Sequence, residues 1–320
     1  IIIDLIEDGS YTELKITRIM AIIDYLSQLG FNLLQLRVMS DYGFSVSLHK
    51  NRYSFGTLGS YFMGYTMPSI RAIIKHATLR GMEVMPEISI TTRAGGWHNA
   101  VPLLACPNYY CETFSGLSVN TSDASILPVV LAVVKELQSD FTSPYIHFGY
   151  DERNESQACY DEAKMVPRFD VLERKIERLL GFHGVDMKKV LRWQNAENKR
   201  YPKRAGKVTH YLVSDPKPEP GEEFFMTNDL MLHNTESKHT NAWDLYEYVQ
   251  SMVKFKPTGI LAWVGSIRDE SLKALNMRQR LLAVSIGLSH DGLNYEEFSD
   301  VFNSTCHAVN NRQCEKFGKF

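Results

Sequence analysis

Two adjacent carboxylates, Asp151 and Glu152, are the residues whose type and spacing point most directly to chemistry. They follow a mostly apolar segment at 145–148 and a glycine, so they stand where a buried strand is expected to end. Neighbouring like charges make each other's ionisation less favourable, and a carboxyl group with a raised pKa can act as a general acid. The alternative interpretation is an exposed acidic turn in which Arg153 pairs with one of the two acids.

Composition bounds the classes of protein to which such an acid pair can belong. The chain has 320 residues, of which 44% are apolar and 22% charged, and this is typical of a folded globular protein. The 35 basic and 37 acidic residues give a net charge of −2, so no basic field favours nucleic acid, and no apolar run is long enough for a membrane span. The chain starts in an apolar segment without an initiator methionine or signal peptide, so we expect a domain truncated at its N-terminus.

Strand-like and helix-like segments alternate along the chain. Strands are expected at 1–6, 31–38, 82–90, 145–149, 189–195, 207–213, 223–228 and 259–265. Apolar residues at helical spacing are found at 16–26, 70–77, 127–134, 169–180, 243–253 and 271–287. This order predicts an α/β fold, a (β/α)8 TIM barrel that forms a single domain over residues 1–320. The Pro-rich segment 214–223 is expected to be a long loop inside that domain and not a linker.

In such a barrel the chemistry gathers at the carboxyl ends of the strands. The residues at the expected strand ends are Asp4, Arg37, Asp41, Glu87, Asp151, Glu152, Trp193, Asn195, Asn228 and Trp263. Tryptophan faces stack on the C–H surfaces of pyranose rings, while carboxylates and amides hold hydroxyl groups. We therefore expect a sugar site at this end of the barrel.

Several stretches resemble one enzyme family. HFGYDE (147–152) resembles the H-x-G-G-D-E signature of glycoside hydrolase family 20, the β-N-acetylhexosaminidases. LGFNLLQLRVMSDYGF (29–44) and RGMEVMPEISI (80–90) are similar to the second and third strands of that family. VLRWQNAE (190–197) and GILAWVGS (259–266) are similar to later strands that carry tryptophan. The similarity runs from Asp4 to about residue 287.

The resemblance implies substrate-assisted retaining catalysis, in which the acetamido carbonyl of the substrate attacks the anomeric carbon. Glu152 would then protonate the leaving glycosidic oxygen. Asp151 would hold the acetamido N–H and stabilise the positive charge that develops. The residues expected to bind the substrate are Trp193, Trp263, Asp41, Glu87, His147 and Arg37.

Structural interpretations compete for some of these positions. The alternative role of Trp193 and Trp263 is packing in the barrel core. Glu87 is expected to face the mouth of the barrel and hold His147 or a positive group, and its alternative role is that of a structural acid. For His147 we favour a hydrogen-bonded core histidine over a proton carrier. Asp4 matches a first-strand aspartate of the family and is expected to be mainly structural.

Other positions depart from the family pattern. Ser40 and Ser89 stand where aspartates are usual, TTR (91–93) replaces P-G-H, and Gly265 and Ser266 occupy the place of a glutamate. Residues 228–234 lack the usual tyrosine and aspartate, and the first-strand arginine lies upstream of residue 1 or is absent. Three functions therefore stay open. They are hydrolysis of terminal β-linked N-acetylhexosamine residues from glycans, sugar binding by a catalytically weak or inactive relative, and another barrel hydrolase that uses the same acids.

The remaining expectations concern partners and compartment. We expect an oligosaccharide or glycoconjugate substrate, no cofactor or metal, no nucleic acid and no membrane span, and we leave a homodimer open. Cysteine pairs at short spacing and sequons at Asn120, Asn154 and Asn303 favour a secreted or lysosomal protein. The expected disulfides, each closing a short surface loop, are Cys106–Cys111 and Cys306–Cys314, with Cys159 as a thiol.

Overall fold

The structure is a computed structural model, and it describes part of the chain. The described residues are 1–5, 16–40, 43–48, 65–90, 96–97, 126–149, 190–194, 208–212, 216–227, 241–265 and 275–310, with isolated positions at 171–182, 230 and 232. The predictions made for Asp41, Asp151, Glu152, Asn195 and Asn228 lie outside these residues.

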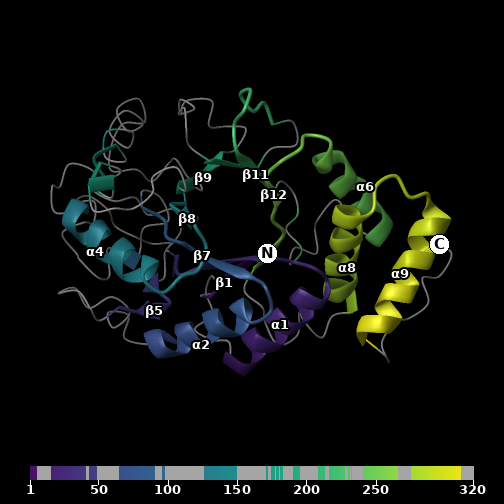
Figure 1. Ribbon diagram of the computed structural model, residues 1–320, viewed down its shortest axis with the longest axis horizontal. Coiled ribbons are helices and arrows are strands. Elements are labelled where there is room, and N and C mark those ends of the chain that lie inside the picture. Colours follow the sequence, from purple (N-terminus) through teal and green to yellow (C-terminus); the bar gives the residue numbers. More distant parts are fainter. Residues whose placement is uncertain are drawn as a thin grey trace, which may run out of the picture.

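Parallel strands form a closed ring (Figure 1). They are β1 (Ile2–Asp4), β2 (Leu33–Arg37), β7 (Glu83–Glu87), β8 (Ile146–His147), β9 (Val190–Gln194), β10 (Val208–Tyr211), β11 (Phe224–Met226), β12 (Gly259–Ile260) and β13 (Trp263–Gly265). The last two are segments of one strand: β12 pairs with β11 and β13 pairs with β1, which closes the ring. Every expected strand is present, and the (β/α)8 barrel is confirmed.

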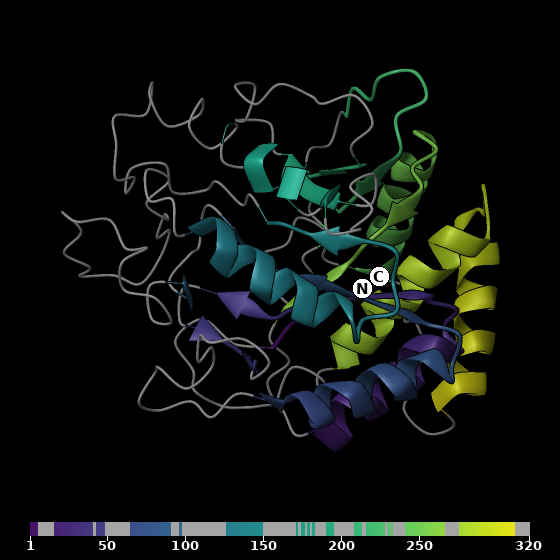
Figure 2. The ribbon, with the colours of Figure 1, turned by 60° about the vertical axis from the view of Figure 1, so that its left-hand side comes forward.

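Helices cover the outside of this ring (Figure 2). They are α1 (Ile16–Gln28), α2 (Met67–Thr78), α4 (Ile126–Gln138), α6 (Ala242–Val253), α8 (Leu275–Ser289) and α9 (Tyr295–Asn310). The ends of α2 follow from its sequence, because the Thr66 side chain accepts from the Ser69 amide, Pro68 lies in the first turn, and Gly81 takes a φ of 74° beyond the end.

Helix α9 packs outside α8 and was not predicted. Asn294 and Glu297 cap it reciprocally, since each backbone N–H donates to the other residue's side chain at 3.0 Å. Cys306 lies on the buried face of this helix and is 5% exposed, and its predicted pairing with Cys314 stays a prediction because Cys314 lies outside the described residues. Cys306 is disulfide-bonded, and its partner lies outside the described residues.

Short strands extend the barrel between β2 and α2. β3 (Met39–Ser40) and β4 (Gly43–Phe44) form an antiparallel pair, while β5 (Val46–Ser47) pairs in parallel with β6 (Tyr65–Thr66). The ring of Trp97 packs edge-on against Phe44 at 5.1 Å, and its indole N–H donates to the Ser89 carbonyl at 2.6 Å. These strands follow directly on β2, at the carboxyl end of the barrel.

The connection from β10 to β11 forms no helix where it is described, at 216–223, which agrees with the loop expected there. Its Glu222 carboxylate accepts from the Thr209 hydroxyl at 2.5 Å and from the Tyr211 hydroxyl at 3.3 Å. Both hydroxyls lie on the outer face of β10, so this loop covers strands that a helix would otherwise cover.

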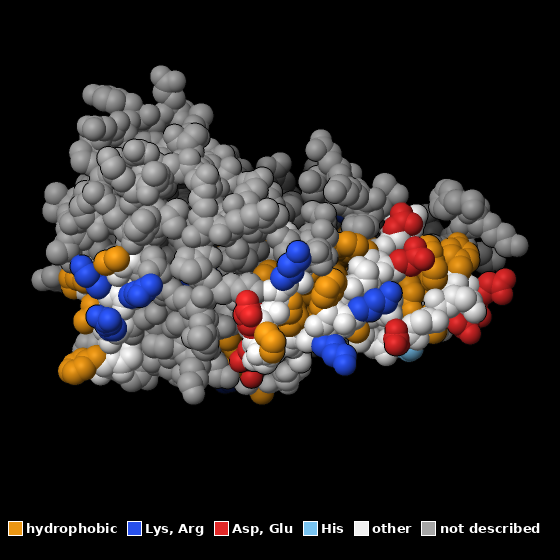
Figure 3. Space-filling model, turned by 90° about the horizontal axis from the view of Figure 1, so that it is seen from above, with side chains coloured by type: hydrophobic (Ala, Val, Ile, Leu, Met, Phe, Trp, Pro, Cys, Tyr) orange, Lys and Arg blue, Asp and Glu red, His pale blue; other side chains and the backbone are white. Residues whose placement is uncertain are grey.

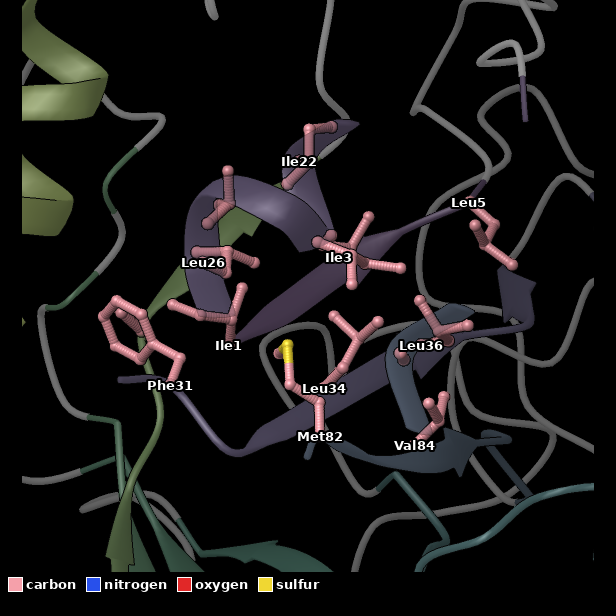
Figure 4. Packing of buried hydrophobic residues seen from close by; sticks show 14 of the residues in the cluster. Ile1, Ile3, Leu5, Ile22, Leu26, Phe31, Leu34, Leu36, Met82 and Val84 are labelled. Carbon is pink, nitrogen blue, oxygen red and sulfur yellow. The ribbon is translucent and has the colours of Figure 1, made fainter. Parts of the chain in front are cut away.

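Alternate residues of each strand face the helices or the barrel interior, as the period of a strand requires. Outward-facing Ile3, Leu34 and Leu36 pack against Ile22 and Leu26 of α1 in the larger core (Figure 4). The inward-facing core is smaller and contains Ile2, Met85, Leu191, Trp193, Val208, Phe225, Leu261 and Trp263. The interior changes from apolar to polar toward the carboxyl ends of the strands, where Arg37, Glu87, His147, His210 and Thr227 are buried.

The described surface carries charges of both signs with apolar side chains among them, as the view from above shows (Figure 3). Within the described part of the chain, no helix has the length and apolar character needed to cross a membrane.

Candidate active site

Strand register brings charged side chains together at the carboxyl end of the barrel. Asp4 of β1 is level with Arg37 of β2, Arg37 is level with Glu87 of β7, and Glu87 is level with His147 of β8. The register therefore alternates the signs of the first three side chains across neighbouring strands. This alternation gives each buried charge a neighbour of opposite sign, which offsets part of the cost of removing the charge from water.

Glu87 is the centre of this network. Its Oε2 accepts from Gln35 Nε2 at 2.5 Å, and its Oε1 accepts from the indole N–H of Trp193 at 3.0 Å. Arg37 Nη2 lies 3.2 Å from the same Oε1. His147 Nδ1 is 4.0 Å from that oxygen, which is too far for a hydrogen bond. Glu87 thus holds a positive group, Arg37, one of the two partners expected for it from the sequence.

The environment keeps the Glu87 carboxylate ionised. Burial alone would raise the pKa of Glu87, but the Arg37 guanidinium, the nearby His147 ring and the hydrogen bonds from Trp193 and Arg37 together outweigh it and hold the pKa at about 2. Glu87 is completely buried and Arg37 is 5% exposed, so both charges act inside the barrel and not at its surface.

Arg37 connects this network to Trp263. Its guanidinium carbon lies 4.3 Å from the centre of the Trp263 ring, a cation–π geometry, and its Nε is 3.4 Å from Asp4 Oδ1. Asp4 Oδ2 in turn accepts from the Trp263 indole N–H at 3.0 Å. Both tryptophans predicted for the sugar site are therefore fixed through their indole N–H groups by buried or partly buried carboxylates.

Trp193 also packs against two histidines. The His210 ring of β10 is stacked on it with 3.9 Å between centroids, and the His147 ring lies at 4.7 Å. His210 Nδ1 is 3.2 Å from His147 Nε2, and His210 Nε2 is 2.6 Å from the Thr227 hydroxyl. Neither histidine is exposed, and burial is the largest cause that lowers the pKa of His210 well below its usual value.

The hydrogen bonds fix the tautomers of both rings. The Gly149 N–H donates to His147 Nδ1 at 3.0 Å, so the proton of His147 is on Nε2. His147 Nε2–H then donates to His210 Nδ1, which leaves the proton of His210 on Nε2, where it donates to Thr227. His147 is the hydrogen-bonded core histidine that the sequence favoured.

Gly149 is the last described residue after β8, two residues before Asp151 in the sequence. Its φ of 77° is left-handed, and a Cβ at this position would lie 2.8 Å from the Ser89 Cα. Its carbonyl accepts from the Trp193 backbone N–H at 2.9 Å. Both peptide groups of Gly149 are thus bound by residues of the buried network.

Of the predicted site residues, the structure brings Arg37, Glu87, His147, Trp193 and Trp263 into one cluster. Three members of the same network were not predicted from the sequence, namely Gln35, His210 and Thr227. Gln35 and His210 lie on the inward faces of β2 and β10, and Thr227 continues the inward alternation directly after β11, so the two-residue alternation was the available signal. It gives the direction of a side chain but not its partner.

A cavity of about 480 Å³ lies at the opposite end of the barrel. Its lining includes Leu33, Glu83, Tyr145 and Gly259, which stand at or next to strand starts. Because barrel enzymes place their chemistry at the carboxyl ends, this cavity is not our candidate site. No cluster of three or more potential metal-ligating side chains is found among the described residues.

Known proteins are similar to this chain in sequence and in fold. Residues 8–206 match the profile of the glycosyl hydrolase family 20 catalytic domain. The pig β-hexosaminidase subunit beta is 28% identical over 155 residues, which are 46% of this chain and 28% of that protein. The rat β-hexosaminidase subunit alpha is 26% identical over 153 residues, or 45% and 28% of the two chains.

Solved structures extend the similarity to nearly the whole chain. A β-N-acetylhexosaminidase from Bacteroides fragilis superposes with a TM-score of 0.73 at 19% identity, covering 99% of this chain and 71% of that one. The Streptomyces coelicolor enzyme gives 0.72 at 16% identity, covering 97% and 68%. These likenesses show the fold, and the profile match extends over more than half of the chain. The chain belongs to glycosyl hydrolase family 20.

Proposed function

We propose that this protein hydrolyses terminal β-linked N-acetylhexosamine residues of glycans by substrate-assisted retaining catalysis. Family membership supports the reaction class, and the relatives named above are hexosaminidases by their names. A glycan substrate also fits a barrel whose carboxyl end carries tryptophans and carboxylates.

The observation that carries the proposal is the fixed tryptophan pair. Trp193 donates to Glu87 and Trp263 donates to Asp4, each through its indole N–H at 3.0 Å. An aromatic wall held by carboxylates keeps its orientation when a substrate binds, and such preorganisation suits recognition of an acetamido methyl group. Trp193 is 2% exposed and Trp263 is 8% exposed, so they would form the floor of the sugar site and not its rim.

Glu152 is the proposed proton donor to the leaving glycosidic oxygen. Asp151 is the proposed partner of the acetamido N–H, and its negative charge would stabilise the oxazolinium-like intermediate. Both residues follow β8 closely, and in a barrel this position faces the substrate. Their adjacency would raise the pKa of the acid, as general-acid catalysis near neutral pH requires.

Leaving-group kinetics separates the two roles. Glu152→Gln should reduce turnover of substrates with poor leaving groups by roughly 10²–10⁴-fold, because those leaving groups need a proton. It should spare most activity on highly acidic aryl leaving groups. Asp151→Asn should cause a loss that is the same for every leaving group, since each N-acetyl substrate needs the charge. Glu296→Gln, at an exposed position of α9, is the matched control and should change nothing.

Wild-type turnover in both variants on every active substrate would contradict the proposed roles.

One observation favours the second function, a sugar-binding relative without catalysis. Arg37 and Glu87, two residues expected to bind substrate, are buried and bonded to each other. That function predicts negligible turnover in the wild type and sugar affinity that responds little to either acid substitution.

A further inference from the structure

His210 connects two parts of the candidate active site that come from different strands. Its ring stacks on Trp193, which is the proposed floor of the sugar site. Its Nδ1 accepts from His147, whose own Nδ1 accepts from the Gly149 N–H at the end of β8. The buried His210 side chain thus contacts Trp193 directly and supports Gly149 through His147.

The hydrogen-bond chain runs in one direction through this region. It passes from the Gly149 N–H through His147 and His210 to the Thr227 hydroxyl that follows β11, with steps of 3.0, 3.2 and 2.6 Å. Every ring nitrogen in the chain is used. A ring flip of either histidine would place ring carbons where the bonded nitrogens lie, and a change of tautomer would set donor against donor or acceptor against acceptor, so the two imidazoles fix each other's orientation.

The Gly149 peptide is also held from its other side. Its carbonyl accepts from the Trp193 backbone N–H at 2.9 Å, and the Trp193 side chain packs on both histidines. Movement of the His210 ring would therefore disturb the N–H partner of Gly149 and the packing of Trp193 together. Asp151 and Glu152 follow two and three residues after Gly149 in the sequence.

We propose that His210 is a positioning residue for the hydrolysis: through His147 it fixes Gly149, which precedes the acid pair by two residues in the sequence, and by stacking it fixes Trp193. This inference rests on the proposed function. It assigns His210 no contact with the substrate. A misplacement of about 1 Å at a catalytic group costs roughly 10²-fold in rate, so a small shift of the strand end is sufficient for a measurable effect.

Paired substitutions separate the two contacts of His210. His210→Phe keeps a ring that can stack on Trp193 but removes both hydrogen bonds. His210→Asn keeps an acceptor near Nδ1 for His147 but removes the stacked ring. Thr227→Val removes only the last acceptor of the hydrogen-bond chain and preserves the shape of the side chain. His307→Phe, at an exposed histidine of α9, is the control.

The kinetic readout is kcat and KM on aryl β-N-acetylglucosaminides with poor and with acidic leaving groups. For His210→Phe we expect a kcat loss of about 10- to 100-fold on the poor leaving group, which needs both Asp151 and Glu152, and a smaller loss on the acidic one, which needs Asp151 alone. His210→Asn should recover part of this kcat while raising KM, since Trp193 loses its support. Thr227→Val should show the His210→Phe pattern with a smaller amplitude. A residue that only stabilised the fold would lower the active fraction equally for all substrates.

One result would overturn the inference. The wild type is active, the His210→Phe and Thr227→Val variants are folded, and their kcat depends on the leaving group as the wild-type kcat does. If the wild type hydrolyses no N-acetyl substrate, the proposed function itself fails, and this inference fails with it. Activity of the wild type therefore distinguishes failure of the inference alone from failure of the proposed function. Long-range ¹H–¹⁵N spectra of the wild type provide a test without turnover. Nε2–H tautomers of both buried histidines would support the hydrogen-bond chain, and an Nδ1–H tautomer of either histidine would refute it.

Discussion

At the scale of single residues, the Glu87 carboxylate is shared among the Gln35 amide, the Arg37 guanidinium and the Trp193 indole. A glutamine in its place would present an amide N–H to one of these donors in either orientation. It would also leave the Arg37 charge with Asp4 as its nearest acid in the network. Loss of one partner from a buried ion pair is far more costly than loss of an exposed one.

We therefore expect Glu87→Gln to lower the free energy of unfolding by about 3–5 kcal/mol, measured by urea denaturation at pH 7. Glu83→Gln, at an exposed position of the same strand, is the control and should cost less than about 0.5 kcal/mol. A loss for Glu87→Gln no larger than that of the control would show that the carboxylate is not the centre of the network.

The same residue gives a pH dependence. The pKa of Glu87 is about 2 in the folded protein and roughly 4.3 in an unfolded chain. A lowered folded-state pKa stabilises the protein above the unfolded value, and this stability is lost as the pH falls from about 4.3 toward 2. The wild-type minus Glu87→Gln difference in unfolding free energy should shrink across that window. A difference independent of pH would contradict the assignment.

At the scale of elements, the end of β8 depends on Gly149. An alanine there would need a left-handed φ, and its Cβ would approach the Ser89 Cα. Gly30 also has a left-handed φ, 79°, but a Cβ added at Gly30 would meet no other atom within 4 Å. The two glycines therefore separate backbone strain from steric overlap.

We expect Gly30→Ala to cost about 1–2 kcal/mol, which is the cost of the left-handed conformation alone. Gly149→Ala should cost clearly more in the same thermal or urea unfolding measurement, because the backbone of Ser89 must also move. Ser89→Ala in addition should not restore stability, since the overlap with the backbone of residue 89 persists. Equal costs at the two glycines would mean that β8 and β7 separate readily.

The sequence located elements better than partners. All eight strands were predicted because the buried strands of a barrel are apolar runs separated by glycine, proline and polar residues. Helices α1, α2, α4, α6 and α8 were predicted from their apolar residues at helical spacing. Helix α9 was missed although Asn294 and Glu297 form a recognisable cap. The roles of Gln35, His210 and Thr227 depend on contacts between strands distant in sequence, and one sequence contains no signal for such pairing.

At the scale of the whole molecule, register is what assembles the candidate site. One residue of slip in β2 would turn Arg37 from the barrel interior toward the helices and leave Glu87 without its cation. The resemblance to the family was sufficient to predict the barrel and the order of its strands. It did not reveal that Arg37 and Glu87 would be buried as an ion pair, because that depends on contacts between the inward-facing side chains of two strands.

The central claim is that the acetamido group of the substrate takes part in the reaction, and one comparison tests it most directly. The purified protein is incubated with aryl β-N-acetylglucosaminide, aryl β-N-acetylgalactosaminide and the plain aryl β-glucoside, all with the same leaving group, and release of the aryl alcohol is followed. We predict release from one or both of the acetamido sugars and none from the glucoside, which has no internal nucleophile. Equal release from the plain glucoside would contradict the claim.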